Sequence, residues 1–458
     1  MRLSNRFVRW IPAVALALVA PAAASAVGAS LHTALKRSEP AADSRLDRAP
    51  TRVSLWFTGK PQVAFSSIRL QTPSGEIGLD SIVADTGFSL HAAIPQVLGP
   101  GTYTVIWRTA SADGHPIRGE FAFTVSASAA DTAPPTIADS SVVSGPVDAV
   151  HRETVSEYRT ARWMEFVALL TILGALGFRH AVLPPLASRG VPTTDAADRA
   201  RRLGQSVLVL YFVAILVRVY AEAAALSSPA QALSADVLFP LLGGTTWGFG
   251  WSAGLVGALV LLAGWAISRR SIAVGTPIAL TGAFAMVLSP ALTGHAAASR
   301  NFVLGVTLDV LHVGAAGLWL GGLLMVLLVG IPAMRRLTDG NPDAAVSALV
   351  NSFHPLALFC APIVVIAGLG SGWLRLGDID ALTSTRYGET LLWKLALVVL
   401  LIALGAYNSS RARKRLGTTQ GTSAFRRSAA IELLLAALVL AATTRLITTP
   451  MPISSLTP

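Results

Sequence analysis

Long apolar runs dominate the second part of the chain. Eight runs of membrane-spanning length are separated by short polar connections, at residues 163–183, 206–226, 247–267, 274–293, 302–331, 353–374, 390–407 and 428–448. A helix needs roughly 20 apolar residues to cross a bilayer. The pattern therefore predicts an all-α polytopic membrane domain of about eight transmembrane helices over residues 161–450, followed by a tail at 451–458.

Short alternating runs, rather than long ones, fill residues 30–126. Four of them are rich in aromatic and β-branched residues, at residues 53–57, 67–70, 103–107 and 121–125. A domain of roughly 95 residues with this spacing predicts an all-β, immunoglobulin-like (cupredoxin-like) sandwich. Residues 127–160 lack apolar periodicity and are rich in Ala, Ser, Thr, Asp and Pro, which predicts a linker.

The first 29 residues have the order of a secretory signal peptide. Arg2, Arg6 and Arg9 precede an apolar stretch at 11–20, and small residues follow as far as Ala29. We expect cleavage near residue 30, with an uncleaved anchor as the alternative.

Composition supports a membrane location. The chain is 53% hydrophobic and 13% charged, with a mean hydropathy of +0.59, far more apolar than an ordinary globular enzyme. Its net charge of +11 resides largely in short loops, where cations bias membrane topology. The expected surroundings are therefore a lipid bilayer, and no nucleic acid is expected as a partner.

Cations in the loops also predict the orientation. Alternate loops hold fifteen of them, namely Arg179, Arg189, Arg199, Arg201, Arg202, Arg269, Arg270, Arg335, Arg336, Arg411, Arg413, Lys414, Arg415, Arg426 and Arg427. The opposite connections and the tail hold four: Arg300, Arg375, Arg386 and Arg445. Because cation-rich loops stay in the cytoplasm, the β-domain and the C-terminus are predicted on the extracytoplasmic side of a bacterial-type cytoplasmic (inner) membrane.

A carboxylate and an imidazole flank a glycine near the end of the β-domain. Asp113 and His115 are two residues apart, which on a strand means the same face. They could converge on a metal completed by a third ligand, whereas a turn with a surface histidine is the alternative. The single cysteine, Cys360, excludes a thiolate cluster and an internal disulfide.

Several segments together resemble the CopC/CopD copper resistance family. Residues 32–41, 100–107 and 111–116 look like a CopC copper-binding domain, and residues 309–323, 387–394 and Asn408 look like CopD. The resemblance implies a fused protein of copper uptake, homeostasis and resistance. It also implies an outer Cu(II) site formed by His32, Asp113 and His115.

The chemistry of these three side chains suits the ion, since nitrogen donors with one carboxylate favour Cu(II). The role of the His32 amine depends on the cleavage site. It needs cleavage after Leu31, a poor residue for that position; cleavage after Ala29 would leave His32 third, able to bind Cu(II) through the terminal amine, two amides and its ring. No methionine follows the signal in the β-domain, so a Cu(I) thioether site is not expected there.

Ionisable residues within predicted spans are functional candidates. Asp309 and His312 share one helix face, and His295 lies just before that helix, so the three form a candidate membrane copper path. In it, His312 binds copper and Asp309 orients its ring or offsets charge. The alternative is a structural pairing of Asp309 and His312 with each other or with Arg218. His354 is a candidate exit residue.

The leading hypothesis is a copper permease, not an enzyme, which captures Cu(II) outside and moves copper inward. A P-loop is absent from the sequence, so no ATPase is expected within the chain. A periplasmic copper chaperone is a candidate partner; the sequence leaves open the oligomeric state, the driving force and the oxidation state in transit. Two alternatives are a non-transporting copper sequestration or sensing protein, and a membrane haem or quinone oxidoreductase.

Overall fold

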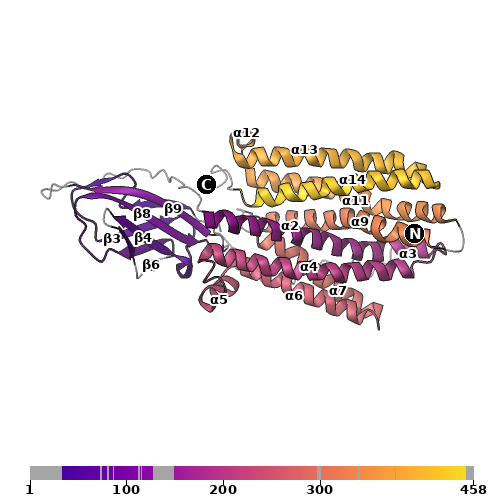
Figure 1. Ribbon diagram of the computed structural model, residues 1–458, viewed down its shortest axis with the longest axis horizontal. Coiled ribbons are helices and arrows are strands. Elements are labelled where there is room, and N and C mark those ends of the chain that lie inside the picture. Colours follow the sequence, from indigo (N-terminus) through magenta and orange to yellow (C-terminus); the bar gives the residue numbers. More distant parts are fainter. Residues whose placement is uncertain are drawn as a thin grey trace.

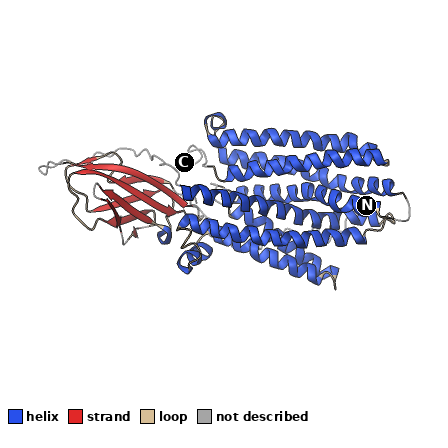
Figure 2. Cartoon of the chain, in the orientation of Figure 1, coloured by secondary structure: helices blue, strands red, loops and turns tan. Residues whose placement is uncertain are grey.

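The computed structural model places a β-domain on one end of a bundle of long helices (Figures 1 and 2). It describes residues 34–126 and 149–449, apart from 73–74, 80–81, 86, 112–113, 115, 295, 297–300, 338–340 and 377. The predicted signal peptide and four of the predicted site residues, His32, Asp113, His115 and His295, lie outside the described residues.

The β-domain is a sandwich of two sheets, as the sequence predicts. Their strand orders are β1-β3-β7-β6 and β2-β9-β8-β4-β5, antiparallel except for the β2–β9 pair. Alternate residues of both sheets point inward and form one apolar core. The strands are β1 (Leu35–Glu39), β2 (Arg45–Leu46), β3 (Arg52–Phe57), β4 (Ser67–Thr72), β5 (Gly75–Leu79), β6 (Val83–Asp85), β7 (Ser89–Ala93), β8 (Gly101–Ala110) and β9 (Pro116–Val125).

Within the described residues, eight helical spans are long and apolar enough to cross a membrane, which confirms the predicted number. Several spans contain more than one helical element. The α-helices are α2 (Ala149–Gly177), α3 (Leu183–Ala187), α4 (Thr194–Leu226), α5 (Ala235–Gly244), α6 (Thr246–Ile267), α7 (Ile272–Leu292), α8 (Phe302–Ala316), α9 (Gly322–Met325), α10 (Ile331–Arg335), α11 (Pro342–Leu376), α12 (Ala381–Ser384), α13 (Arg386–Tyr407) and α14 (Thr419–Ile447).

The spans depart from the simple sequence pattern in two ways. Helix α2 already begins at Ala149, inside the segment predicted as a linker, so it extends beyond its apolar part toward the β-domain. The fifth span is interrupted by two π-helical turns, η3 (Gly317–Gly321) and η4 (Val326–Gly330). Such turns insert a residue into the helical repeat and change which side chains face a neighbour.

Helix α2 runs through the middle of the bundle, between α4 on one side and α14 on the other (Figure 1). It packs closely on the fifth span where Gly174 meets Gly321: a Cβ atom at either position would overlap backbone of the opposite helix. Small residues permit this approach, which is how helices associate in an apolar solvent. The close packing fixes the fifth span, and with it α8, against α2.

The β-domain rests directly on the outer ends of the helices. Phe65 and Ala110 are buried in the same apolar cluster as residues of α2, α4 and α6. Arg108 of β8 donates a hydrogen bond from Nη1 to the carbonyl of Ser227, just after α4, at 2.7 Å. Burial, followed by the nearby cations Arg69 and Arg118, lowers the pKa of Arg108 from its ordinary value. The two parts of the chain therefore share a packed interface.

Candidate functional site

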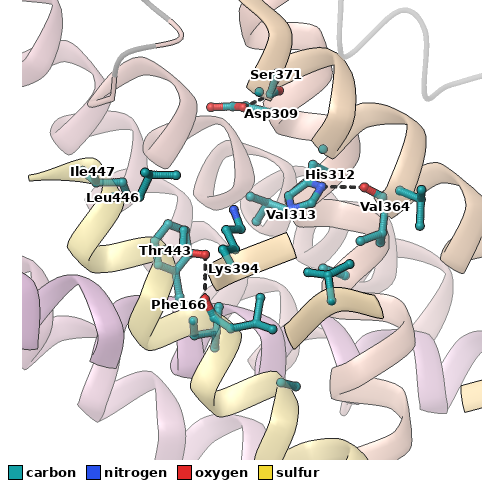
Figure 3. A pocket seen from close by; sticks show the side chains of 18 of the residues that line it. Phe166, Asp309, His312, Val313, Val364, Ser371, Lys394, Thr443, Leu446 and Ile447 are labelled. Atoms are coloured by element: carbon teal, nitrogen blue, oxygen red, sulfur yellow. Dashed lines mark hydrogen bonds between the residues drawn. The ribbon is translucent and has the colours of Figure 1, made fainter. Parts of the chain in front are cut away.

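A cavity of about 190 Å³ lies among α2, α8, α11, α13 and α14, and most of its lining is apolar. Figure 3 shows polar side chains entering it from different helices. The polar and charged residues of the lining are Arg162, Asp309, His312, Trp319, Ser371, Arg375, Tyr387, Lys394 and Thr443. Two predicted path residues, Asp309 and His312, are therefore brought to one cavity.

His312 is fixed in a defined orientation by helix α11. Its Nδ1 lies 2.8 Å from the carbonyl oxygen of Val364. Because a carbonyl can only accept, Nδ1 must be the donor, and the neutral ring keeps an unshared electron pair on Nε2. Gly368 gives the ring its space, since a Cβ atom there would lie 2.9 Å from the ring's Cε1. This arrangement leaves Nε2 available as a metal ligand.

Asp309 interacts with α11 rather than with His312. Both of its carboxylate oxygens lie within hydrogen-bond distance of Arg375 Nη2, at 2.8 and 2.7 Å, and Ser371 Oγ donates to it at 2.9 Å. The expectation that Asp309 orients the His312 ring is therefore wrong, because the Val364 carbonyl does so. A guanidinium gives a carboxylate a stronger, charge-assisted bond than a neutral imidazole would.

Arg218 does not pair with either residue. Its Nη1 lies 2.9 and 2.7 Å from the two oxygens of Glu165, and Arg162 Nη1 donates to the same carboxylate at 3.2 Å. The side chains of Glu165 and Arg218 are 0% exposed, so each needs the other in place of water. Sequence reasoning missed Arg162 and Glu165; three charges in two apolar spans were the available signal.

Lys394 enters the cavity from α13, and its ammonium extends into the space that Asp309 and His312 also border (Figure 3). In the described part of the chain it makes no hydrogen bond or ion pair. In the sequence, Lys394 lies in the segment that resembles CopD, and no role was assigned to it. The structure shows that it brings a positive charge to the same space as Asp309 and His312.

Two other polar residues singled out in the sequence lie away from this cavity. Asn408 donates from Nδ2 to Glu432 at 2.6 Å and accepts a hydrogen bond from Ser428, which ties α13 to α14. His354 Nδ1 lies 3.4 Å from Ser409 Oγ, toward the opposite end of the bundle from the β-domain. Among the described residues, no group of three or more His, Cys, Asp or Glu side chains could hold a metal ion.

The predicted outer ligands flank a residue that the structure does describe. Gly114 has φ +89° and lies between β8 and β9, and its amide donates to the Ser111 carbonyl at 2.9 Å. Gly114 is thus in a turn. A Cβ atom on Gly114 would lie 2.9 Å from Trp247 Cβ and 3.3 Å from Thr245 Cβ. Gly114 packs against the start of α6.

Family models match three consecutive parts of the chain. They are the CopC domain over residues 35–126, the copper resistance protein D-like N-terminal domain over residues 156–306, and copper resistance protein D over residues 347–446. Together they cover the sandwich and most of the helical bundle.

Two relatives match different lengths of the chain. Copper transport protein CutJ of Bacillus subtilis is 24% identical over 394 residues, covering 84% of this chain and 69% of its own. Copper resistance protein C of Escherichia coli is 36% identical over 110 residues, covering 22% of this chain and 86% of its own.

Two solved structures are similar to the β-domain in sequence. CopC from Methylosinus trichosporium OB3b is 33% identical, covering 21% of this chain and 94% of its own, with a TM-score of 0.19. PcoC, a methionine-rich copper resistance protein from Escherichia coli, is 34% identical, covering 20% of this chain and 98% of its own, also with a TM-score of 0.19. From the family models and the sequence relatives, the chain belongs to the copper resistance family as a fused CopC–CopD membrane protein.

Proposed function

We propose that this protein captures Cu(II) outside the cytoplasmic membrane and moves copper inward through its helices. Three domain matches and the relative described as a copper transport protein support a role in copper handling. Eight spans are far more than an anchor for the β-domain needs, which favours transport over sequestration alone.

The proposed capture site consists of His32, Asp113 and His115. An imidazole pair with one carboxylate suits Cu(II), the divalent ion that such donors bind most tightly. Gly114, which separates Asp113 from His115 in the sequence, packs on Trp247 at the start of α6. Copper held by this segment would thus be released beside the membrane helices.

The proposed membrane step takes place in the cavity. The orientation of the His312 ring is the observation that supports it most directly. The bond from Nδ1 to the Val364 carbonyl leaves Nε2 as the electron-pair donor of a side chain that lines the cavity. Metal-binding histidines usually donate a hydrogen bond from the N–H of the ring nitrogen that does not bind the metal. Asp309, although bonded to Arg375, adds a negative charge to the same cavity, and His295 precedes the fifth span in the sequence.

The proposed orientation has the β-domain and the C-terminus on the extracytoplasmic side of a bacterial cytoplasmic membrane. The cation-rich connections lie at the end of the bundle remote from the β-domain (Figure 1). An excess of Arg and Lys in short loops marks the cytoplasmic side.

Copper accumulation in cells tests the proposal. Cells that lack their own copper uptake are given the wild type, His312→Ala or His115→Ala, and initial rates are measured over a range of copper concentrations. We expect His312→Ala to lose the rate gained with the wild type. His115→Ala should lose rate chiefly at low copper, because capture matters most when the ion is scarce.

Matched histidines serve as controls. His91→Ala removes an imidazole of the β-domain that bonds to Ser89, and His180→Ala removes one from the π-helical turn η2 (Phe178–Val182), remote from the β-domain. Both should transport as the wild type does. Wild-type cells that accumulate copper no faster than cells without the gene would refute transport.

A further inference from the structure

The charges around the membrane cavity do not balance. Asp309 is bonded to Arg375 through both carboxylate oxygens, and Arg162 is bonded to Glu165. Lys394 alone among the described charged residues of the lining has no ion-pair partner. An ammonium in an apolar membrane interior is costly unless an anion or water accompanies it.

Two neighbouring groups in this cavity need opposite partners. His312 Nε2 offers an electron pair and therefore favours a cation, whereas the Lys394 ammonium offers three N–H donors and favours an anion. Figure 3 shows the Lys394 side chain extending into the space that Asp309 and His312 also border. A bare copper ion at Nε2 would be repelled by that ammonium, and an anion alone would leave the imidazole unused.

We propose that the cavity binds a small monovalent anion at Lys394, and that this anion accompanies copper as its co-ligand at His312. The anion would contact the metal on one side and the ammonium on the other, so that both charges are compensated. The ligand class is a halide or a small carboxylate. The copper part of this inference rests on the proposed function; the anion site does not.

Binding of the anion and of copper should then be coupled. Because coupling between two ligands is reciprocal, an anion that raises copper affinity is itself bound more tightly with copper present. We expect the affinity of the wild type for copper to rise about tenfold when the bulky anion of HEPES is replaced by chloride or acetate, a usual size for coupling between sites. The salt that raises the copper affinity, chloride or acetate, identifies whether the co-ligand is a halide or a carboxylate.

The test uses the full-length protein in detergent, with His115→Ala in every variant to remove the outer site. Cu(I), and separately Cu(II), is titrated at a free concentration fixed by a competing chelator. Lys394→Met should bind copper equally in all three salts, and Lys394→Arg should keep the anion dependence. Lys414→Met, which removes an exposed lysine near the remote end of α13, should behave as the wild type.

A second measurement detects the anion without copper. Crystals grown in bromide should give an anomalous peak beside Lys394 Nζ that is absent from Lys394→Met. Copper affinity of the wild type that is equal in all salts, or anion dependence that persists in Lys394→Met, would overturn the co-ligand. If neither copper ion binds in any salt, the membrane step of the proposed function fails, while the bromide peak still decides the anion site.

Discussion

At the scale of single residues, two charged groups of the membrane part are held by partners far away in the sequence. The Asp309–Arg375 bond joins α8 to α11, and Arg218 of α4 bonds to Glu165 of α2. In a protein interior such pairs cost little as long as both members remain, but removing one leaves a charge without compensation. The loss of stability therefore comes mainly from the charged residue that remains without its partner.

Arg375→Leu tests this for the cavity. Of the hydrogen bonds that the described residues make to Asp309, it leaves the one from Ser371, so we expect a loss of about 3 kcal/mol in the free energy of unfolding, as when one member of a buried pair is deleted. The double variant Asp309→Leu/Arg375→Leu should recover most of the lost free energy of unfolding. Thermal and denaturant unfolding in detergent measure both.

The control for that experiment is Arg386→Leu, which removes an exposed arginine at the start of α13. It should change stability by less than about 0.5 kcal/mol, as surface substitutions do. Equal stability of Arg375→Leu and the double variant would show that Asp309 does not depend on Arg375.

At the scale of elements, the contact between α2 and the fifth span rests on glycine. Gly174→Ala would place a methyl group against the backbone of Gly321. We expect it to lower the free energy of unfolding by about 1–3 kcal/mol, the usual cost of overpacking. Gly243→Ala, in α5 with nothing within 4 Å of the added atom, should be neutral or stabilising. A thermal-shift series compares the two.

The elements themselves were largely predictable from sequence. Membrane solvent forces each span to be apolar over its full length, so all eight could be recognised, and so could strands β3, β4, β8 and β9. Strands β1, β2, β5, β6 and β7 were not identified; β2 and β6 are only two and three residues long, and β1 alternates little. Helix α2 begins earlier than expected, since its first turns are not apolar.

The partners of the site residues were not predictable. Helical spacing correctly placed Asp309 and His312 on one face, but nothing in one sequence indicates that Arg375 and Val364 of a later helix face them. Lys394 could be noted as a charge within a span, but its lack of an ion-pair partner among the described residues is a property of the fold. Tertiary packing decides these contacts, and they cannot be predicted from the pattern of a single sequence.

At the scale of the whole molecule, the structure predicts a specific contact between the two domains. The added Cβ atom at Gly114 would lie 3.3 Å from Thr245 Cβ, close to the separation of about 3.5–4.5 Å in disulfides. The same atom would lie 2.9 Å from Trp247 Cβ, so the backbone must shift slightly to admit it. With that shift we expect Gly114→Cys/Thr245→Cys to form a disulfide under mild oxidation, seen as a linked peptide by mass spectrometry without reduction.

Gly87→Cys/Thr245→Cys is the control for this cross-link. Gly87 has a similar positive φ, +97°, but nothing lies within 4 Å of an added Cβ atom. It should remain reduced. The native Cys360 is buried in the bundle and should take no part in either variant. If the β-domain is docked on the helices, only the Gly114→Cys/Thr245→Cys pair should form the cross-link.

The contact of Gly114 with Trp247 also determines what kind of rate process copper transfer would be. Two parts joined in one chain and already packed together have no encounter to wait for, so the step is unimolecular. Its rate per molecule should not depend on how densely the protein populates the membrane. A separately supplied β-domain would have to reach the effective concentration of a tethered one, of millimolar order for short links, to deliver at the same rate.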